Sequence, residues 1–334
     1  MVKTIERMKH KMSVRTDLAV EAKEIYEEKN TREIPGVELK EYRKGRVKIT
    51  EVNVLNEQGE KAMNKTIGNY TTLEIPDVNQ YDTQYKEHIS EILAKALMPL
   101  LKINDNMTAL VVGLGNWNIT PDALGPKVVE KIMITRHLKE YIPDEIDEGI
   151  RPVCAIAPGV LGITGIETAE IIRAVCKKVN PDIVICIDAL ASRRLERVNR
   201  TIQIGNTGIS PGAGVGSRRM ELNEKTLGAP VIAIGVPTVV DAATVANDTI
   251  DMVIDEMIKV ADKDKNFYNM LKSLDRDEKE RMIKEVLNPY VGELMVTPKD
   301  VDTLMDSISK IISTGINIAL QPALDLEDIN GYLN

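Results

Sequence analysis

From residue 81 onward the chain alternates short apolar runs with longer stretches of helical periodicity. The apolar runs, none of which contains a charged residue, are 109–112, 153–156, 183–187 and 231–234. The helical stretches, with apolar residues at three- and four-residue intervals, lie near 86–102, 126–140, 166–179 and 239–259. Strands that alternate with helices build a parallel sheet covered on both faces. The pattern predicts an α/β protein with a three-layer α/β/α core at residues 81–260 and a mostly parallel sheet.

Residues 37–76 follow a different pattern, in which apolar and polar residues alternate. Three such runs, VELKEYR, RVKITEVNVL and NYTTLEIP, are separated by glycine-containing polar segments. A period of two is typical of strands with one buried face. We therefore expect a small additional β subdomain at 37–76, and further helices after the core, at 261–334.

The first 17 residues differ in charge from the rest of the chain. Five basic and two acidic side chains give them a net charge of +3, and few apolar residues anchor them. We interpret residues 1–17 as a removable N-terminal propeptide and 18–334 as the main domain. The stretch DLAVEAKEIYEEK that starts at Asp17 has helical periodicity, and Thr16 is a candidate cap.

The composition argues against several classes of function. A net charge of −8 disfavours direct binding to nucleic acid, which needs clustered basic residues. No apolar run approaches the 18 or so residues of a membrane span, and no secretory leader is present. The spacings of Cys154, Cys176 and Cys186 match no zinc pattern, so reduced core thiols are the simpler interpretation. We expect an intracellular soluble protein.

The segment LVVGLGNWNITPDALGP, residues 110–126, leads from a predicted strand through a glycine-rich loop into a helix. Gly113 and Gly115 permit a tight turn and a close approach of the backbone. Asp122 falls near a helix N-terminus, where the helix dipole favours a carboxylate. An ordinary acidic residue in a first helical turn would explain Asp122 equally well.

Asp188 directly follows the buried strand of PDIVICIDALASRR. A carboxylate in this place is costly to bury without a partner, and Arg193 or Arg194 could supply one. Alternatively, Asp122 and Asp188 face one cleft at the carboxyl ends of neighbouring strands. Two close carboxyl groups tend to share a proton, which provides one general base and one general acid for the attack of water on an amide.

Other motifs fit known chemistry poorly. The GISPG motif at residues 208–212 matches G-x-S-x-G, but its proline and second glycine prevent the helix that a serine-hydrolase elbow needs. The histidines, His10, His88 and His137, suit neither a catalytic triad nor a zinc site. Asn118 stands where a dinucleotide-binding loop needs its third glycine. The glycine-rich segment 205–219 is either a surface connection or a mobile flap beside the cleft.

Several strings of the sequence form a recognisable set: GLGNWNITPDALGP, ITRHL, RPVCAIAPGVLGITGIET, CIDALASRRLERVN, GISPGAGVG, IAIGVPTVVDA and LMVTPKDVD. They resemble the germination protease of endospore-forming bacteria. The similarity runs from about residue 13 to residue 318. It implies an endopeptidase that degrades small acid-soluble spore proteins at germination by an atypical aspartic mechanism without a cofactor. Asp122 and Asp188 match the essential aspartates of the family, and we expect a supporting role in the cleft for Gly113, Gly115, Asn116, Thr120 and Arg193.

The resemblance also implies a precursor that removes its own leader at a site similar to those in its substrates. The matching stretch is TDLAVE, residues 16–21, with cleavage between Asp17 and Leu18. This bond coincides with the charge boundary, and its cleavage would change the net charge from −8 to −11. A homotetramer in the cytoplasm of the developing spore and in the spore core is also implied.

A more distant similarity connects the family with hydrogenase-maturation endopeptidases, which bind nickel through two acids and a histidine. No histidine here follows a later strand end, so the third ligand is missing and no metal is expected. Two alternatives stay open: a metal-assisted peptidase with the aspartates as ligands, and a non-catalytic protein that only binds spore proteins.

Overall fold

The computed structural model describes residues 16–29, 33–76, 82–102, 104, 106–142, 144, 146, 149–210, 220–260, 282–283, 285–286 and 294–333. Of the predicted propeptide, only Thr16 and Asp17 are therefore described. The proposed flap at 205–219 is described as far as Ser210, and residues 211–219 lie outside the described part. Most of the region between residues 261 and 293 lies outside it as well.

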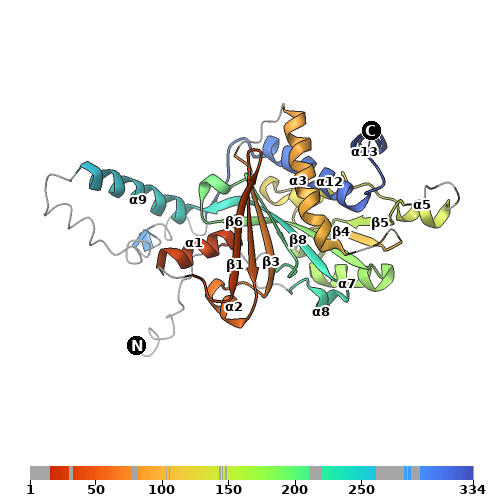
Figure 1. Cartoon of the computed structure of the whole chain (residues 1–334), viewed down its shortest axis with the longest axis horizontal. Helices are drawn as coiled ribbons and strands as arrows, with labels where there is room; N and C mark the ends of the chain where they lie inside the picture. Colours follow the sequence, from red (N-terminus) through yellow and green to blue (C-terminus); the bar gives the residue numbers. More distant parts are fainter. Residues whose placement is uncertain are drawn as a thin grey trace.

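The described strands form one nine-stranded sheet in the order β1-β2-β3-β7-β8-β6-β4-β5, with β9 beside β8 (Figure 1). Their bounds are Val37–Lys44 (β1), Val47–Val54 (β2), Gly68–Glu74 (β3), Ala109–Gly113 (β4), Val153–Ile156 (β5), Ile183–Ser192 (β6), Thr201–Gly205 (β7), Val231–Asp241 (β8) and Met295–Val296 (β9). Strands β8, β6, β4 and β5 are parallel to one another, as predicted. The other pairs are antiparallel, which makes the sheet mixed.

Strands β6 and β8 start where the sequence predicts but run further, to Ser192 and Asp241. The prediction stopped both strands where their apolar runs end. In the structure the two strands continue to pair past that point, with Asp188 opposite Gly235 and a register shift between Leu190 and Ala191. The polar residue at the end of the apolar run therefore lies inside the sheet.

The three strands of the predicted β subdomain pair antiparallel, and they continue the core sheet. Strand β3 pairs with β7, and β7 pairs with the core strand β8. Strand β7 was not predicted, because its five residues TIQIG carry a glutamine at their centre and follow a polar stretch. Because β7 bridges the two regions, one continuous sheet forms.

Helices cover both faces of the sheet, which confirms the α/β class. Their bounds are Ala19–Lys29 (α1), Glu57–Met63 (α2), Thr83–Leu101 (α3), Leu124–Val129 (α4), Arg136–Tyr141 (α5), Leu161–Thr164 (α6), Thr168–Val179 (α7), Glu224–Leu227 (α8), Ala242–Val260 (α9), Val301–Leu320 (α12) and Leu326–Leu333 (α13). The single helix predicted near 126–140 is two short ones, α4 and α5. No helix in the described ranges is long and apolar enough to cross a membrane.

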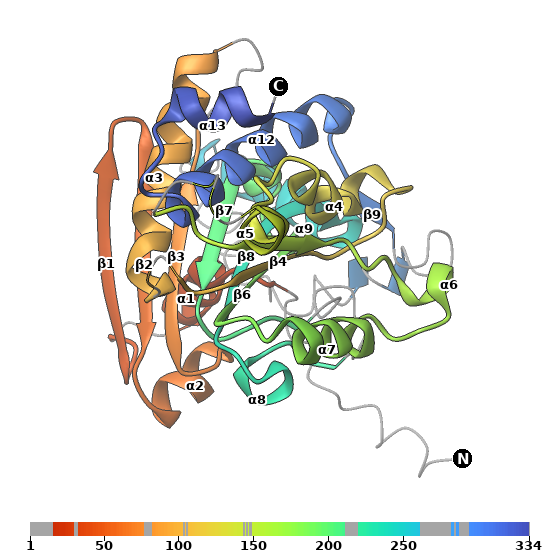
Figure 2. The same ribbon diagram turned by 90° about the vertical axis from the view of Figure 1, so that its right-hand side faces the viewer.

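Successive residues of the central strands face opposite layers, as the pleat of a strand requires. Ile183, Ile185 and Ile187 of β6 pack in the cluster that includes α3, α4 and α12. Val184 and Cys186 pack in the cluster that includes α7 and α8. Figure 2 shows these two helices on the other side of β6 from α12. Since Asp188 continues the second series, its side chain belongs to the face that α7 and α8 cover.

Candidate active site

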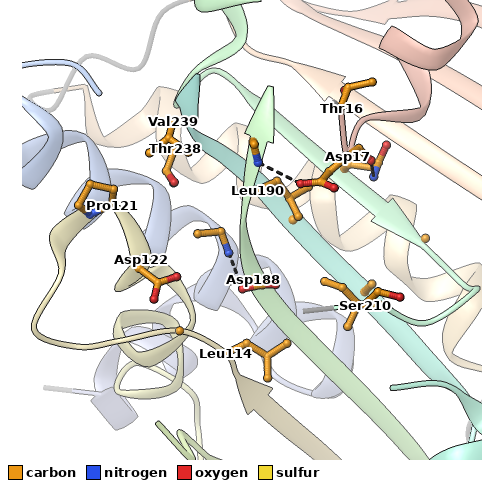
Figure 3. A pocket seen from close by; sticks show the side chains of 18 of the residues that line it. Thr16, Asp17, Leu114, Pro121, Asp122, Asp188, Leu190, Ser210, Thr238 and Val239 are labelled. Carbon is orange, nitrogen blue, oxygen red and sulfur yellow. Dashed lines mark hydrogen bonds between the residues drawn. The ribbon is translucent and has the colours of Figure 1, made fainter. Parts of the chain in front are cut away.

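A cavity of about 720 Å³ lies beyond the carboxyl end of β4, over the later parts of β6 and β8. Asp122 and Asp188 both line it, together with Leu114 and Pro121 (Figure 3). Gly115 lines it as well. The two aspartates that the sequence analysis selected are therefore brought together in one cavity.

Asp122 is positioned by the loop that follows β4. The Leu114 N–H donates to the Ile187 carbonyl at 2.8 Å, which extends the pairing of β4 with β6 by one step. The Asn116 N–H then donates to both the main-chain oxygen and Oδ2 of Asp122, at 3.0 and 2.8 Å. Thr120 opens the short 3₁₀ helix η3, Thr120–Asp122, which ends on the aspartate. These contacts hold the carboxyl group beside the end of β4.

Gly115 adopts φ +115°, and a Cβ there would lie 2.0 Å from the Asp122 carbonyl oxygen. Only glycine accommodates both the left-handed backbone and this contact. The expectation that glycine permits a tight turn here is met by the geometry. Of the five residues predicted to support the cleft, Gly115 lines the cavity, whereas Gly113, Asn116, Thr120 and Arg193 do not.

Replacing Gly113 with Ala is expected to destabilise the fold by about 1–3 kcal/mol, because a Cβ there would lie 2.2 Å from the carbonyl oxygen of Gly125. The closeness of β4 and α4 at this point depends on the missing side chain. Urea unfolding measures the loss. Gly162→Ala is the matched control, since a Cβ on Gly162 has no neighbour within 4 Å; equal stability of the two variants would contradict the prediction.

Asp188 lies within β6 and only 6 % of it is exposed. Its Oδ1 accepts the N–H of Ala189 at 2.9 Å. Gly113 pairs with Ile187, so Asp188 stands one step beyond the last paired residues of β4 and β6. The approach of Asp188 to the loop of Asp122 follows directly from this register.

The described end of the predicted propeptide also lies in this cavity, since Thr16 and Asp17 line it. Asp17 Oδ2 accepts the N–H of Ala191 at 3.1 Å, and the Asp17 N–H donates to the Ala191 carbonyl at 3.3 Å. Desolvation raises the pKa of the Asp17 carboxyl, although the Ala191 N–H and the Lys65 charge oppose that shift. The residue before the predicted cleavage site is thus bound along β6, three positions after Asp188.

Glu21, the second acid of the TDLAVE stretch, is buried and held by several donors. It accepts the N–H groups of Arg193 and Arg194 at 2.7 and 3.0 Å and pairs with Arg197 at 3.2 Å. Arg197 also binds Glu24 through two nitrogens, at 2.9 and 2.6 Å. Desolvation would raise the pKa of the Glu24 carboxyl, but the hydrogen bond and charge of Arg197 hold it below its ordinary value. Glu21 and Glu24 anchor α1 beside the cavity.

Sequence reasoning missed Lys65, Gln203 and Arg197. Lys65 and Gln203 contact Asp17 across 48 and 186 positions of the chain. Arg197 reaches Glu24 across 173 positions. No local motif marks Lys65 or Gln203, and Arg197 lies in the string CIDALASRRLERVN without any sign there of its partners. Among the described residues, no group of three or more His, Cys, Asp or Glu side chains is arranged to hold a metal ion.

Comparison with known proteins identifies close relatives. A family model described as germination protease matches residues 15–265 and 254–333. The germination protease of Clostridium tetani is 91 % identical over 323 residues, which cover 97 % of this chain and 100 % of the relative. That of Clostridium perfringens strain ATCC 13124 is 62 % identical over 96 % of this chain and 99 % of the relative. That of Bacillus cereus strain G9842 is 44 % identical, with coverages of 96 % and 97 %.

Proposed function

Since this chain belongs to the germination protease family and is a peptidase, we propose that it is an endopeptidase that degrades small acid-soluble spore proteins during germination. The observation that supports the proposal most is the cavity that Asp122, Asp188 and Asp17 line together. The two candidate catalytic acids and Asp17, which precedes the proposed cleavage site in the leader, therefore line the same cavity. The developing spore and the spore core are the compartments in which such a substrate occurs.

The proposed mechanism uses the two carboxyl groups as an acid and base pair. One aspartate, in its charged form, takes a proton from a water molecule as the water oxygen attacks the carbonyl carbon. The other aspartate, in its neutral form, gives a proton to the leaving nitrogen. Two carboxyl groups that lie close together tend to share one proton, and in the proposed mechanism this keeps one in each form.

The chain is proposed to be made as a precursor that removes residues 1–17 itself. The position of Thr16 and Asp17 in the cavity supports this proposal, because the leader then blocks the approach of other substrates until it leaves. Removal would change the net charge from −8 to −11, which suits an enzyme that engages DNA-coating proteins without binding DNA. A homotetramer is proposed as the assembled form, and sedimentation of the processed chain measures it.

A chain that starts at Leu18 is expected to cleave a small acid-soluble spore protein at once, whereas the full-length chain should show a lag until its leader is removed. The physical reason is that Thr16 and Asp17 form part of the cavity wall and that Asp17 takes the hydrogen bonds of Ala191, which a substrate is proposed to use instead. Gel analysis from the first seconds after mixing measures the lag. A chain that starts at Thr16 is the control, since it keeps both residues and should remain slow. Equal inertness of the Leu18 chain and the full-length chain would exclude inhibition by the leader.

The proposed activity is tested by incubating the purified protein with a small acid-soluble spore protein and identifying the fragments by mass spectrometry. An intact substrate band would favour a protein that only binds spore proteins. The same assay after thorough chelation, with elemental analysis of the protein, tests the metal-assisted alternative. Full activity without any metal would exclude that alternative.

A further inference from the structure

Two side-chain donors converge on the carbonyl oxygen of Asp17, which belongs to the peptide bond that we propose is cleaved. Lys65 Nζ lies 2.7 Å from this oxygen, and Gln203 Nε2 lies 3.2 Å from it. Both residues line the cavity that contains Asp122 and Asp188. An amide carbonyl with two strong donors is polarised toward the form that carries negative charge on oxygen.

The fold holds both donors in place. Lys65 follows α2 directly after Asn64, whose left-handed backbone with φ 50° ends the helix. Gln203 occupies the middle of β7, and its Oε1 accepts the N–H of Ala19 at 2.6 Å. That contact orients the Gln203 amide so that its nitrogen faces the Asp17 oxygen. The two donors therefore come from separate elements that the sheet brings together.

Strand register relates Gln203 to Asp188. Gly235 of β8 pairs with Asp188 on one side and with Gln203 on the other. Paired residues of neighbouring strands project from the same face, and two strand spacings put the Cα atoms of Asp188 and Gln203 about 10 Å apart. A Cβ at Gly235 would lie 2.3 Å from Leu190 Cδ1, so the glycine makes room for the Leu190 side chain, which packs over it between these two positions.

We propose that Lys65 and Gln203 form the oxyanion-binding site of this enzyme, a role that rests on the proposed cleavage of the Asp17–Leu18 bond. When water attacks the carbonyl carbon of Asp17, one aspartate takes a proton from the water. The π electrons of the carbonyl group move onto its oxygen, which Lys65 and Gln203 bind. The carbonyl re-forms as the bond to the Leu18 nitrogen breaks, and that nitrogen takes a proton from the other aspartic acid.

The surroundings of Lys65 suit this role. Desolvation lowers the pKa of its ammonium group, and the negative charges of Asp17 and Glu21 act against that shift. A cation in a poorly solvated site stabilises a developing oxyanion more strongly than one in water does. The Gln203 amide is neutral but held in position. Lys65 would therefore supply a positive charge to the oxyanion, and Gln203 an oriented N–H donor.

A purely structural role predicts a different outcome from a catalytic one. If Lys65 and Gln203 only fasten the leader, their loss affects the full-length chain alone. If they bind the oxyanion, their loss also lowers kcat for a separate peptide containing TDLAVE, turned over by the chain that starts at Leu18. The effect on KM should be smaller, because an oxyanion exists only in the transition state.

The test compares Lys65→Met and Gln203→Met with the unmodified protein, in leader removal by the full-length chain and in peptide turnover by the Leu18 chain. Each variant is expected to slow both reactions by about 10²–10³-fold, with kcat carrying the loss. Lys65→Arg keeps a donor and should recover part of the rate. Lys61→Met, which removes an exposed lysine of α2, should leave both rates unchanged. Thermal unfolding establishes that every variant is folded.

An unchanged kcat in both variants, or a loss confined to leader removal, would overturn the oxyanion assignment. Asp188→Asn is measured in the same assays, so that a failure of the two-aspartate mechanism can be distinguished from a failure of the oxyanion site. If Asp188→Asn still cleaves, the two-aspartate mechanism is wrong. If Asp188→Asn is inert while Lys65→Met and Gln203→Met turn over normally, only the oxyanion site is wrong.

Discussion

Replacing Asp188 with Asn is expected to abolish both leader removal and the cleavage of spore proteins, with a loss on the order of 10⁴-fold or more. Asn has nearly the same shape and keeps an oxygen for the Ala189 N–H, so the fold should persist. It can neither accept a proton from water nor donate one as a carboxylic acid does. Asp122→Asn should have the same effect, since both acids line the cavity. Mass spectrometry of the purified chain and fragment analysis of an added spore protein measure the two reactions.

Asp182→Asn provides the matched control. Asp182 precedes the same strand β6, at the end of the sheet opposite the cavity, and its Oδ2 accepts the N–H of Thr108 at 2.8 Å. Both cleavage reactions should proceed normally in this variant. Retained cleavage in either Asp122→Asn or Asp188→Asn, with a folded protein, would show that the pair is not the catalytic machinery.

Replacing Arg197 with Met is expected to cost about 3–5 kcal/mol of stability, because it removes the cation that pairs with the buried Glu21 carboxylate. The Arg197 side chain is 6 % exposed and contacts Glu21, Glu24 and Glu74 at 3.2, 2.6 and 3.3 Å. The Glu21 side chain is only 1 % exposed, so its charge would be destabilised the most by the loss of Arg197. Since Glu21 and Glu24 belong to α1, the variant should also weaken the attachment of this helix to Arg197. Chemical denaturation measures the loss of stability.

Arg200→Met is the control for Arg197, because Arg200 is an exposed neighbour three positions further along the chain. Its loss should change stability by less than about 0.5 kcal/mol, as is usual at exposed positions. If both variants unfold at the same denaturant concentration, the buried ion cluster does not stabilise the fold.

The sequence was most informative where one physical rule acts locally. The starts of β4, β5, β6 and β8 were predicted correctly because fully buried strands need continuous aliphatic runs. The juxtaposition of Asp122 and Asp188 in one cavity was anticipated because parallel strands present their carboxyl ends on the same edge of a sheet. Membership of the germination protease family was anticipated from long strings of residues and confirmed by the comparisons.

The sequence alone thus determined the class of fold and the family, and it selected Asp122 and Asp188 as candidate catalytic residues. The tertiary structure decided what surrounds those acids. Strand β3 joins the core sheet by pairing with β7, and β6 and β8 continue to pair beyond their apolar runs. Lys65 and Gln203 both donate hydrogen bonds to the Asp17 carbonyl oxygen. These contacts join residues that are far apart in the chain. Because they form only when the fold brings those residues together, no local periodicity or spacing in the sequence predicts them.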